Sequence, residues 1–346
     1  MYNYDLFTIT MTFTTRPPYD PELSTVLNGL QDIIPSRLTF TNLPKLQEQL
    51  DELWTAKAAI AGTNLRHEEI SIPSLDNSNI VLSIFSPCAS GRADESPRPR
   101  PCIVWFHGGG MLLSNRFIGI QVPLAWATAS DAIVVSVEYR VAPAHPAPKA
   151  VEDCYAAISW ICTSADSSRF GIDKARILIA GCSAGGGLAA GVSLMVRDHT
   201  LAGARACIVG LVLISPMLDD RVDEELAKQF CSERNSVWST ESNELAWRAV
   251  LGHQYGSENV SSWVVPGRAQ DVSGLPRIYL DVGSVDLFRE QCVGFANSVW
   301  RVGGDLALHV WPGAFHGFDI LAPSAALSLK STAARTDWVR DVLALE

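Results

Sequence analysis

The sequence has few basic residues for its size, and this scarcity argues against one class of partner. Its 346 residues contain 27 lysines and arginines against 37 aspartates and glutamates, which gives a formal net charge of −10. Proteins that bind nucleic acid or anionic membranes usually present an excess of positive charge. We therefore expect no nucleic-acid partner.

Long apolar runs are also missing. No run approaches the roughly 18 apolar residues of a membrane-spanning helix. The first 20 residues lack the basic and apolar segments of a secretory signal. These two observations predict a protein without a membrane span that stays in the cytoplasm.

The sequence contains no Cys-x-x-Cys spacing. Its eight cysteines are scattered, mostly inside apolar runs, where a thiol behaves as a small hydrophobic group. This distribution favours reduced cysteines over disulfides, which again fits the cytoplasm, and it gives no indication of a zinc site. We expect no metal site.

What is present is the pattern of a folded α/β protein. Residues 68–75 and 79–85 predict an antiparallel strand pair. Short apolar runs without strict alternation follow, as is typical of parallel strands covered on both faces: "CIVWF", "AIVVSV", "RILIAG", "CIVGLVLI", "RIYLDVG" and "LALHVW". Helical spacing separates several of them, for example at Val151, Tyr155 and Ile158. The alternation predicts an α/β fold with a mostly parallel central sheet flanked by helices.

Two regions do not fit this alternation, and we expect both to form a helical cap over the carboxyl edge of the sheet. Residues 1–60 are the N-terminal cap segment, and residues 217–270 are a helical, charged insertion between two strands. Residues 61–216 and 271–346 then form the main domain, which contains the sheet. The length fits one large domain with such an appendage.

Ser183 is the candidate nucleophile. It stands in "GCSAG" directly after an apolar strand and at the start of a helical, glycine-rich segment. Flanking glycines permit the sharp turn that exposes a serine at a sheet edge, because a Cβ there would clash. The same pattern arises by chance on the order of once in ten chains of this length. The sequence around Ser183 does not match the dinucleotide-binding pattern or the P-loop pattern.

A second glycine cluster, "HGGG", directly follows the strand "CIVWF". Its flexible backbone can turn N–H groups toward a substrate oxygen, so Gly108 and Gly109 are candidate oxyanion-hole donors together with the N–H of Ala184. A plain glycine-rich turn is the alternative.

The candidate base and acid each follow a strand. His316 stands in a glycine-flanked loop after "LALHVW", and Asp286 follows "RIYLDVG"; His309 and Asp281 lie inside those strands. Asp286 would orient the imidazole and stabilise its protonated form. A helix N-cap for Asp286 and a surface-loop position for His316 are the alternatives. The chain order serine, aspartate, histidine is that of the α/β-hydrolases.

With these residues in place, the sequence resembles the hormone-sensitive-lipase-like family of α/β-hydrolase carboxylesterases. The resemblance covers residue 68 to the C-terminus and rests on the motifs "WFHGGG", "VEYRVAPAHPAPKA", "GCSAGGGLAAG", "PMLDDR", "DVGSVDLFRE" and "WPGAFHGF". It implies a triad of Ser183, Asp286 and His316, an oxyanion hole as above, a helical cap, and cofactor-independent hydrolysis of short acyl esters. Family members often dimerise through the sheet edge, so a homodimer is a candidate assembly.

Three positions depart from the family pattern. Cys182 stands where an acidic residue is common before the serine, Ala144 replaces a usual glutamate, and Gln291 follows Glu290 where an Asp-Glu pair is frequent. None of these positions is a member of the triad. We expect Cys182 to be buried and inert, the alternative being a thiol that makes activity sensitive to thiol reagents.

The sequence therefore predicts a serine carboxylesterase acting on small to medium acyl esters. A lactonase, amidase, thioesterase or acyltransferase with the same triad remains an alternative, because the pocket sets the substrate. A non-catalytic ligand receptor on this fold is a further alternative, associated in the family with loss of the histidine. Trp238, Trp247 and Trp263 are candidates for the pocket wall, with ordinary packing of cap helices as the alternative.

Overall fold

The computed structural model describes residues 16–30, 33–88, 99–164, 166–199, 208–231 and 236–344. Within these ranges no helix has the length and apolar character needed to cross a membrane. Cys207 and residues 232–235, which belong to a predicted strand and to the predicted cap insertion, lie outside the described residues.

The described residues form one eight-stranded sheet in the order β1-β2-β4-β3-β5-β6-β7-β8. The strands are β1 (Leu65–Pro73), β2 (Asn79–Pro87), β3 (Arg100–Phe106), β4 (Ile133–Glu138), β5 (Ile172–Cys182), β6 (Ile208–Ile214), β7 (Arg277–Val285) and β8 (Leu306–Phe315). β2 pairs antiparallel with both β1 and β4, and every other pairing is parallel. The predicted antiparallel pair and the mostly parallel sheet are confirmed.

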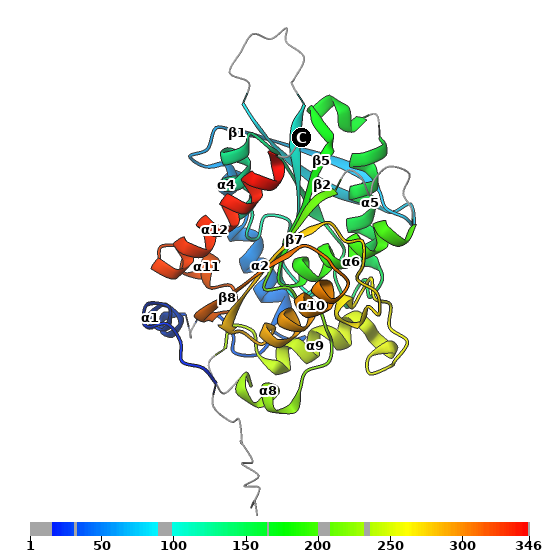
Figure 1. Cartoon of the computed structure of the whole chain (residues 1–346). Coiled ribbons are helices and arrows are strands. Elements are labelled where there is room, and N and C mark those ends of the chain that lie inside the picture. Colours follow the sequence, from blue (N-terminus) through cyan, green and yellow to red (C-terminus); the bar gives the residue numbers. More distant parts are fainter. Residues whose placement is uncertain are drawn as a thin grey trace, which may run out of the picture.

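Helices cover both faces of the sheet, as Figure 1 shows. The helices are α1 (Pro21–Gly29), α2 (Leu43–Leu53), α3 (Ala56–Ile60), α4 (Gln121–Ser130), α5 (Lys149–Thr163), α6 (Ala184–His199), α8 (Glu224–Gln229), α9 (Thr240–Leu251), α10 (Arg289–Arg301), α11 (Phe318–Leu321) and α12 (Ala326–Leu343), with short 3₁₀ turns η1 (Asp166–Phe170), η3 (Gly252–Gln254) and η4 (Pro266–Arg268). Side chains of α5, α6 and α10 join one core cluster, and those of α4 and α12 join another. The two clusters lie on opposite faces of the sheet because successive side chains of a strand alternate.

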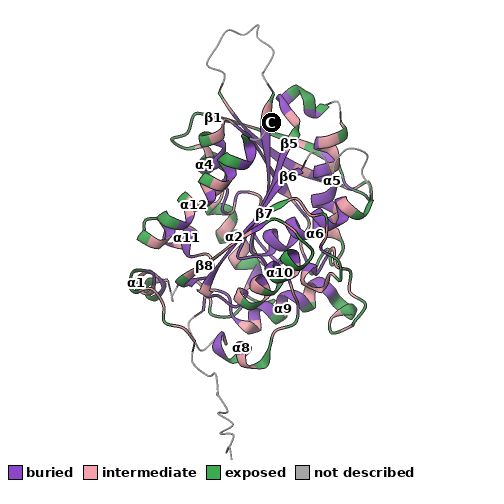
Figure 2. Ribbon diagram, in the orientation of Figure 1, coloured by how far each residue is buried: buried purple, intermediate pink, exposed green. Residues whose placement is uncertain are grey.

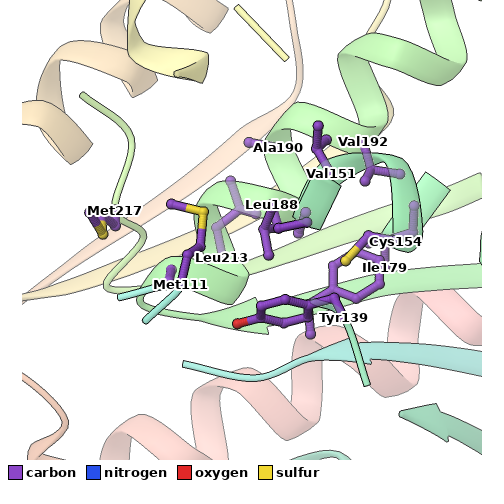
Figure 3. Close-up of a cluster of buried hydrophobic side chains, with 14 of the residues drawn as sticks. Met111, Tyr139, Val151, Cys154, Ile179, Leu188, Ala190, Val192, Leu213 and Met217 are labelled. Atoms are coloured by element: carbon purple, nitrogen blue, oxygen red, sulfur yellow. The ribbon is translucent and has the colours of Figure 1, made fainter. Parts of the chain in front are cut away.

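The central strands are buried along nearly their whole length, and Figure 2 colours them as one purple layer between the helices. β3 is a clear case, because all its residues from Pro101 to Phe106 are buried. Burial on both faces explains why these strands read as continuous apolar runs instead of alternating patterns. Figure 3 shows the core around the start of α6, where Leu188 lies beside Met111 of the loop after β3.

The two segments expected to form a cap contact each other. The backbone N–H of Leu38 donates to Ser242 Oγ of α9 at 2.9 Å, and Arg16 Nη1 donates to Ser236 Oγ at 3.2 Å. The N-terminal segment also contacts β8, because the Asp20 N–H donates to the Gly313 carbonyl at 3.0 Å. Residues far apart in the sequence therefore meet close to the loop that carries His316.

Candidate active site

Ser183 occupies a strained turn between β5 and α6. Its φ of 55° lies in the left-handed region that non-glycine residues seldom adopt. The turn is held by three backbone bonds: the Ser183 N–H donates to Ile214 O at 2.8 Å, and its carbonyl accepts from Gly187 and Met217 at 3.1 and 2.9 Å. The surrounding structure therefore fixes a backbone conformation that places the hydroxyl at the sheet edge.

The flanking glycines are required by the closeness of the backbone. An ideal Cβ at Gly181 would lie 2.2 Å from the Gly185 carbonyl oxygen, and one at Gly185 would lie 2.0 Å from the Phe106 carbonyl oxygen. Real Cβ atoms do not approach a backbone oxygen this closely. Only glycine at both positions lets α6 start directly above the ends of β3 and β5.

The imidazole of His316 bridges the serine and an aspartate. Its Nε2 lies 3.0 Å from Ser183 Oγ, and its Nδ1 lies 2.8 Å from Asp286 Oδ2. All three residues follow the carboxyl ends of strands β5, β7 and β8. The spacing is that of a hydroxyl, a base and an orienting carboxylate in hydrogen-bond contact.

Asp286 is fully buried, with a side-chain exposure of 0%. Both carboxylate oxygens have partners, since Oδ1 accepts from the Phe288 N–H at 2.9 Å and Oδ2 contacts His316. The aspartate thus binds backbone at the start of α10 and also contacts the histidine. Asp286 is not the N-cap of α10, because that position is Phe288 and no side chain caps the helix there.

Two aromatic rings flank His316. The Phe288 ring meets it edge-on, with centroids 5.1 Å apart and planes at 90°. The Trp238 indole lies 6.4 Å away between centroids. Phe288 is completely buried, which limits the freedom of the imidazole on that side. The sequence provided no signal for Phe288 beyond its place two residues after Asp286.

The glycine loop after β3 lies against the serine turn. An ideal Cβ on Gly108 would be 3.4 Å from Ser183 Cβ and 3.3 Å from Cys182 Sγ. Gly109 has φ 114°, and the N–H groups of Leu112 and Leu113 both donate to its carbonyl. The loop therefore passes beside the hydroxyl with backbone only, next to the N-terminus of α6. A helix N-terminus favours negative charge at this place.

Cys182 lies under the turn and is buried, as expected. Burial raises the pKa of its thiol to about 12, with the charge of Asp319 contributing in the same direction and the Gly108 backbone N–H opposing it. At neutral pH the group is a protonated thiol, which is a poor nucleophile. Cys182 therefore acts as a small apolar residue in this site.

The other two departures from the family pattern leave the site intact. Gln291 accepts from the backbone N–H groups of Leu218 and Asp219 at 2.6 and 2.7 Å, a task that needs only an acceptor oxygen. Ala144 is exposed on the surface.

Of the three tryptophans considered as pocket wall, Trp238 lies at the site. An ideal Cβ on Gly110 would lie 2.4 Å from Trp238 Cη2, so the indole occupies the space beside the glycine loop. Trp247 is completely buried in the core. Trp263 donates from Nε1 to Asp198 at 2.8 Å, near the end of α6 remote from Ser183.

No group of three or more potential metal-binding histidine, cysteine, aspartate or glutamate residues occurs among the residues that the structure describes.

A family model described as the alpha/beta hydrolase fold matches residues 103–320. The chain belongs to the hormone-sensitive-lipase-like family of α/β-hydrolases. The matched region contains the glycine loop, Ser183, Asp286 and His316. The family resemblance and the fold class predicted from the sequence are therefore confirmed.

Relatives of this α/β-hydrolase are named esterases. Esterase LipI of Mycobacterium tuberculosis is 27% identical over 308 residues, which cover 88% of each chain. Carboxylesterase NlhH of the same species is 27% identical, covering 90% of this chain and 93% of the relative. The structure of a bacterial heroin esterase superimposes with a TM-score of 0.81 at 31% identity, covering 94% of this chain and 98% of the other. The predicted enzyme class, carboxylic ester hydrolase, is confirmed.

Proposed function

We propose that the protein hydrolyses small to medium carboxylic esters through an acyl-enzyme on Ser183. The observation that supports this most is the position of the His316 ring, in hydrogen-bond contact with both Ser183 Oγ and Asp286 Oδ2. Family membership and the fold add to it.

In the first half of the reaction, Ser183 Oγ attacks the ester carbonyl carbon while His316 Nε2 takes the hydroxyl proton. Asp286 accepts from Nδ1 and stabilises the imidazolium. The carbonyl oxygen becomes an oxyanion, bound by the N–H groups of Gly108, Gly109 and Ala184. His316 then returns the proton to the leaving alcohol as the carbon–oxygen bond breaks.

In the second half, water replaces the alcohol. His316 Nε2 removes a proton from the water as its oxygen attacks the acyl carbon, and the oxyanion forms again in the same place. Collapse of this intermediate releases the carboxylic acid and returns the proton to Ser183 Oγ. Each lost oxyanion donor is expected to cost about 2.7–4 kcal/mol of transition-state stabilisation.

In this proposal the cap limits the size of the substrate. Residues 1–60 and 217–270 form the cap over the catalytic domain of residues 61–216 and 271–346. Trp238, which is 9% exposed, stands beside the glycine loop and His316 as an apolar wall. A wall this close to His316 favours compact acyl groups over long chains.

Assembly and location are part of the same proposal. β8 is an edge strand of the sheet, and its Val310 is 39% exposed, so a second copy of the chain is the partner we propose for this edge. None of the seven described cysteines forms a disulfide with another described residue, which fits the cytoplasm. Neither nucleic acid nor a cofactor is part of the proposed activity.

The test is hydrolysis of 4-nitrophenyl acetate and butyrate by the wild type and two serine variants. Ser183→Ala should lower kcat by more than about 10³-fold. Ser193→Ala is the matched control, because among the described residues its buried hydroxyl bonds only to the Ala189 carbonyl within α6. The proposal fails if the wild type leaves both esters intact or if Ser183→Ala keeps normal turnover. Tight ligand binding without turnover would instead favour a receptor.

A further inference from the structure

A cluster of three charged side chains lies in the interior next to the histidine loop, which is residues 316–317 between β8 and α11. Arg335 of α12 and Asp281 of β7 each have a side-chain exposure of 1%, and Asp319 of α11 has 3%. Arg335 Nε donates to Asp281 Oδ2 at 2.6 Å, and Arg335 Nη1 donates to Asp319 Oδ2. None of these residues belongs to the proposed triad or oxyanion hole.

Stability alone does not explain such a cluster. Removing charges from water costs several kcal/mol per ion, and buried ion pairs are often replaceable by apolar groups without loss of stability. The cluster also leaves Asp281 Oδ1 and Arg335 Nη2 without a hydrogen-bond partner among the described residues. A buried guanidinium does, however, fix the direction of the carboxylates it binds, because its donors are rigid and planar.

The cluster joins the segments that carry the site. Asp319 follows His316 by three residues and lies in the four-residue helix α11. Asp281 lies on β7, five residues before Asp286. Its backbone carbonyl accepts from the Ser215 N–H at 2.7 Å. Ser215 in turn follows Ile214, whose carbonyl binds the Ser183 N–H. One guanidinium therefore connects the histidine loop to the strand that leads to the aspartate.

β8 contributes a further contact to the same carboxylate. Trp311 Nε1 donates to Asp281 Oδ2 at 3.0 Å, so this oxygen binds both the arginine and the strand that ends directly before His316. Helix α11 also lies near the serine turn, because a Cβ on Gly119 would be 3.3 Å from Ile320 Cδ1 and 3.8 Å from Cys182 Sγ. The histidine loop is thus held on both sides of His316.

We infer that Arg335 is a positioning residue: through Asp319 and Asp281 it holds His316 at bonding distance from Ser183 and Asp286. The inference rests on the proposed function, since it assigns a role within the same site. A catalytic group displaced by about 1 Å can cost about 10²-fold in rate. Loosening the Asp319 contact should therefore lower kcat and leave KM for a small ester within about twofold.

The experiment compares Asp319→Ala with Asp319→Asn and with a control. Asp319→Asn keeps one acceptor oxygen for Arg335 and should recover most of the activity that Asp319→Ala loses. Asp220→Ala is the matched control, because Asp220 is a buried carboxylate bound by both Arg268 Nε and Nη2, at 2.7 and 2.6 Å, away from His316. The control should lose thermal stability and keep its kcat.

Two measurements are made on all variants that show a cooperative melting transition. Kinetics with 4-nitrophenyl acetate should give an about 10²-fold lower kcat for Asp319→Ala. Hydrogen exchange should be faster in peptides covering residues 311–322 in that variant only. An unchanged kcat in Asp319→Ala, unchanged exchange in that variant, an equal kcat loss in Asp220→Ala, or an Asp319→Asn variant as poor as Asp319→Ala would overturn the inference.

Hydrogen exchange does not depend on turnover, so the inference and the proposed function fail separately. An inactive wild type, or an active Ser183→Ala, contradicts the proposed function whatever the exchange result. Faster exchange around His316 in Asp319→Ala would still support the anchoring role of Arg335, and unchanged exchange would overturn it.

Discussion

The indole of Trp238 and the imidazole of His316 lie with their centroids 6.4 Å apart and their planes inclined by 40°. The same indole comes within 2.4 Å of the position that a Cβ on Gly110 would take. Its Nε1 donates to Asn243 Oδ1 at 3.2 Å, which fixes the ring to α9. A residue of the proposed cap thus lies beside both the glycine loop and the histidine.

This position predicts that Trp238→Ala changes the preferred acyl length. Removing the indole opens space next to Ser183, so kcat/KM for a hexanoate ester relative to the acetate should rise by about tenfold. Measuring both aryl esters under the same conditions gives the ratio. Trp263→Ala, which removes an indole held by Asp198, should leave the ratio unchanged. A ratio unaffected in Trp238→Ala would show that this side chain does not limit the acyl group.

Substitution by alanine should lower the stability of the protein at Gly185 and raise it at Gly294. At Gly185 a Cβ would lie 2.0 Å from the Phe106 carbonyl oxygen, so Gly185→Ala should displace the start of α6 and lower both stability and kcat. Gly294 is exposed within α10, and its Cβ would meet nothing within 4 Å. Gly294→Ala should raise the free energy of unfolding by about 0.5–1 kcal/mol.

Urea unfolding with aryl-ester kinetics measures both effects. Equal stability of Gly185→Ala and the wild type would mean that the turn adapts to a side chain, contrary to the geometry.

Cys182 should not react with thiol reagents at the pH of the assay. With a pKa of about 12, raised by burial, the thiolate fraction falls as pH decreases and is about 10⁻⁴ at pH 8. Iodoacetamide should therefore modify the exposed Cys88 and leave activity unchanged. Peptide mass spectrometry identifies the modified residues. Inactivation that parallels alkylation of Cys182, and that Cys182→Ala abolishes, would contradict this expectation.

Much of the site could be predicted because its local features depend on short segments of the sequence. A strand followed by Gly-x-Ser-x-Gly leads to a turn that only glycine permits, and this predicts the position of Ser183 without knowledge of the rest of the chain. The same holds for the glycine loop after β3 and for the placing of Asp286 and His316 just beyond strand ends. Both residues lie there in the structure, and their catalytic roles stay proposals.

Position relative to the strand already favoured His316 over His309 as the candidate base, and the structure gives the physical reason. His309 lies within β8 and stacks between Tyr279 and Trp311, with centroids 4.8 and 5.5 Å from theirs. A side chain in the middle of a strand points to a face of the sheet, whereas one beyond its end can reach the edge. His316 meets this condition, and His309 does not.

The sequence by itself determined the α/β alternation, the strained turn at Ser183 and the order of the site residues, because these depend on local backbone preferences and on periodicity. Only the tertiary structure decided which cap tryptophan stands beside His316 and that Arg335, Asp281 and Asp319 meet in the interior. Such contacts join segments that are distant in the chain. They depend on the order of strands in the sheet and on helix packing, which no short pattern encodes.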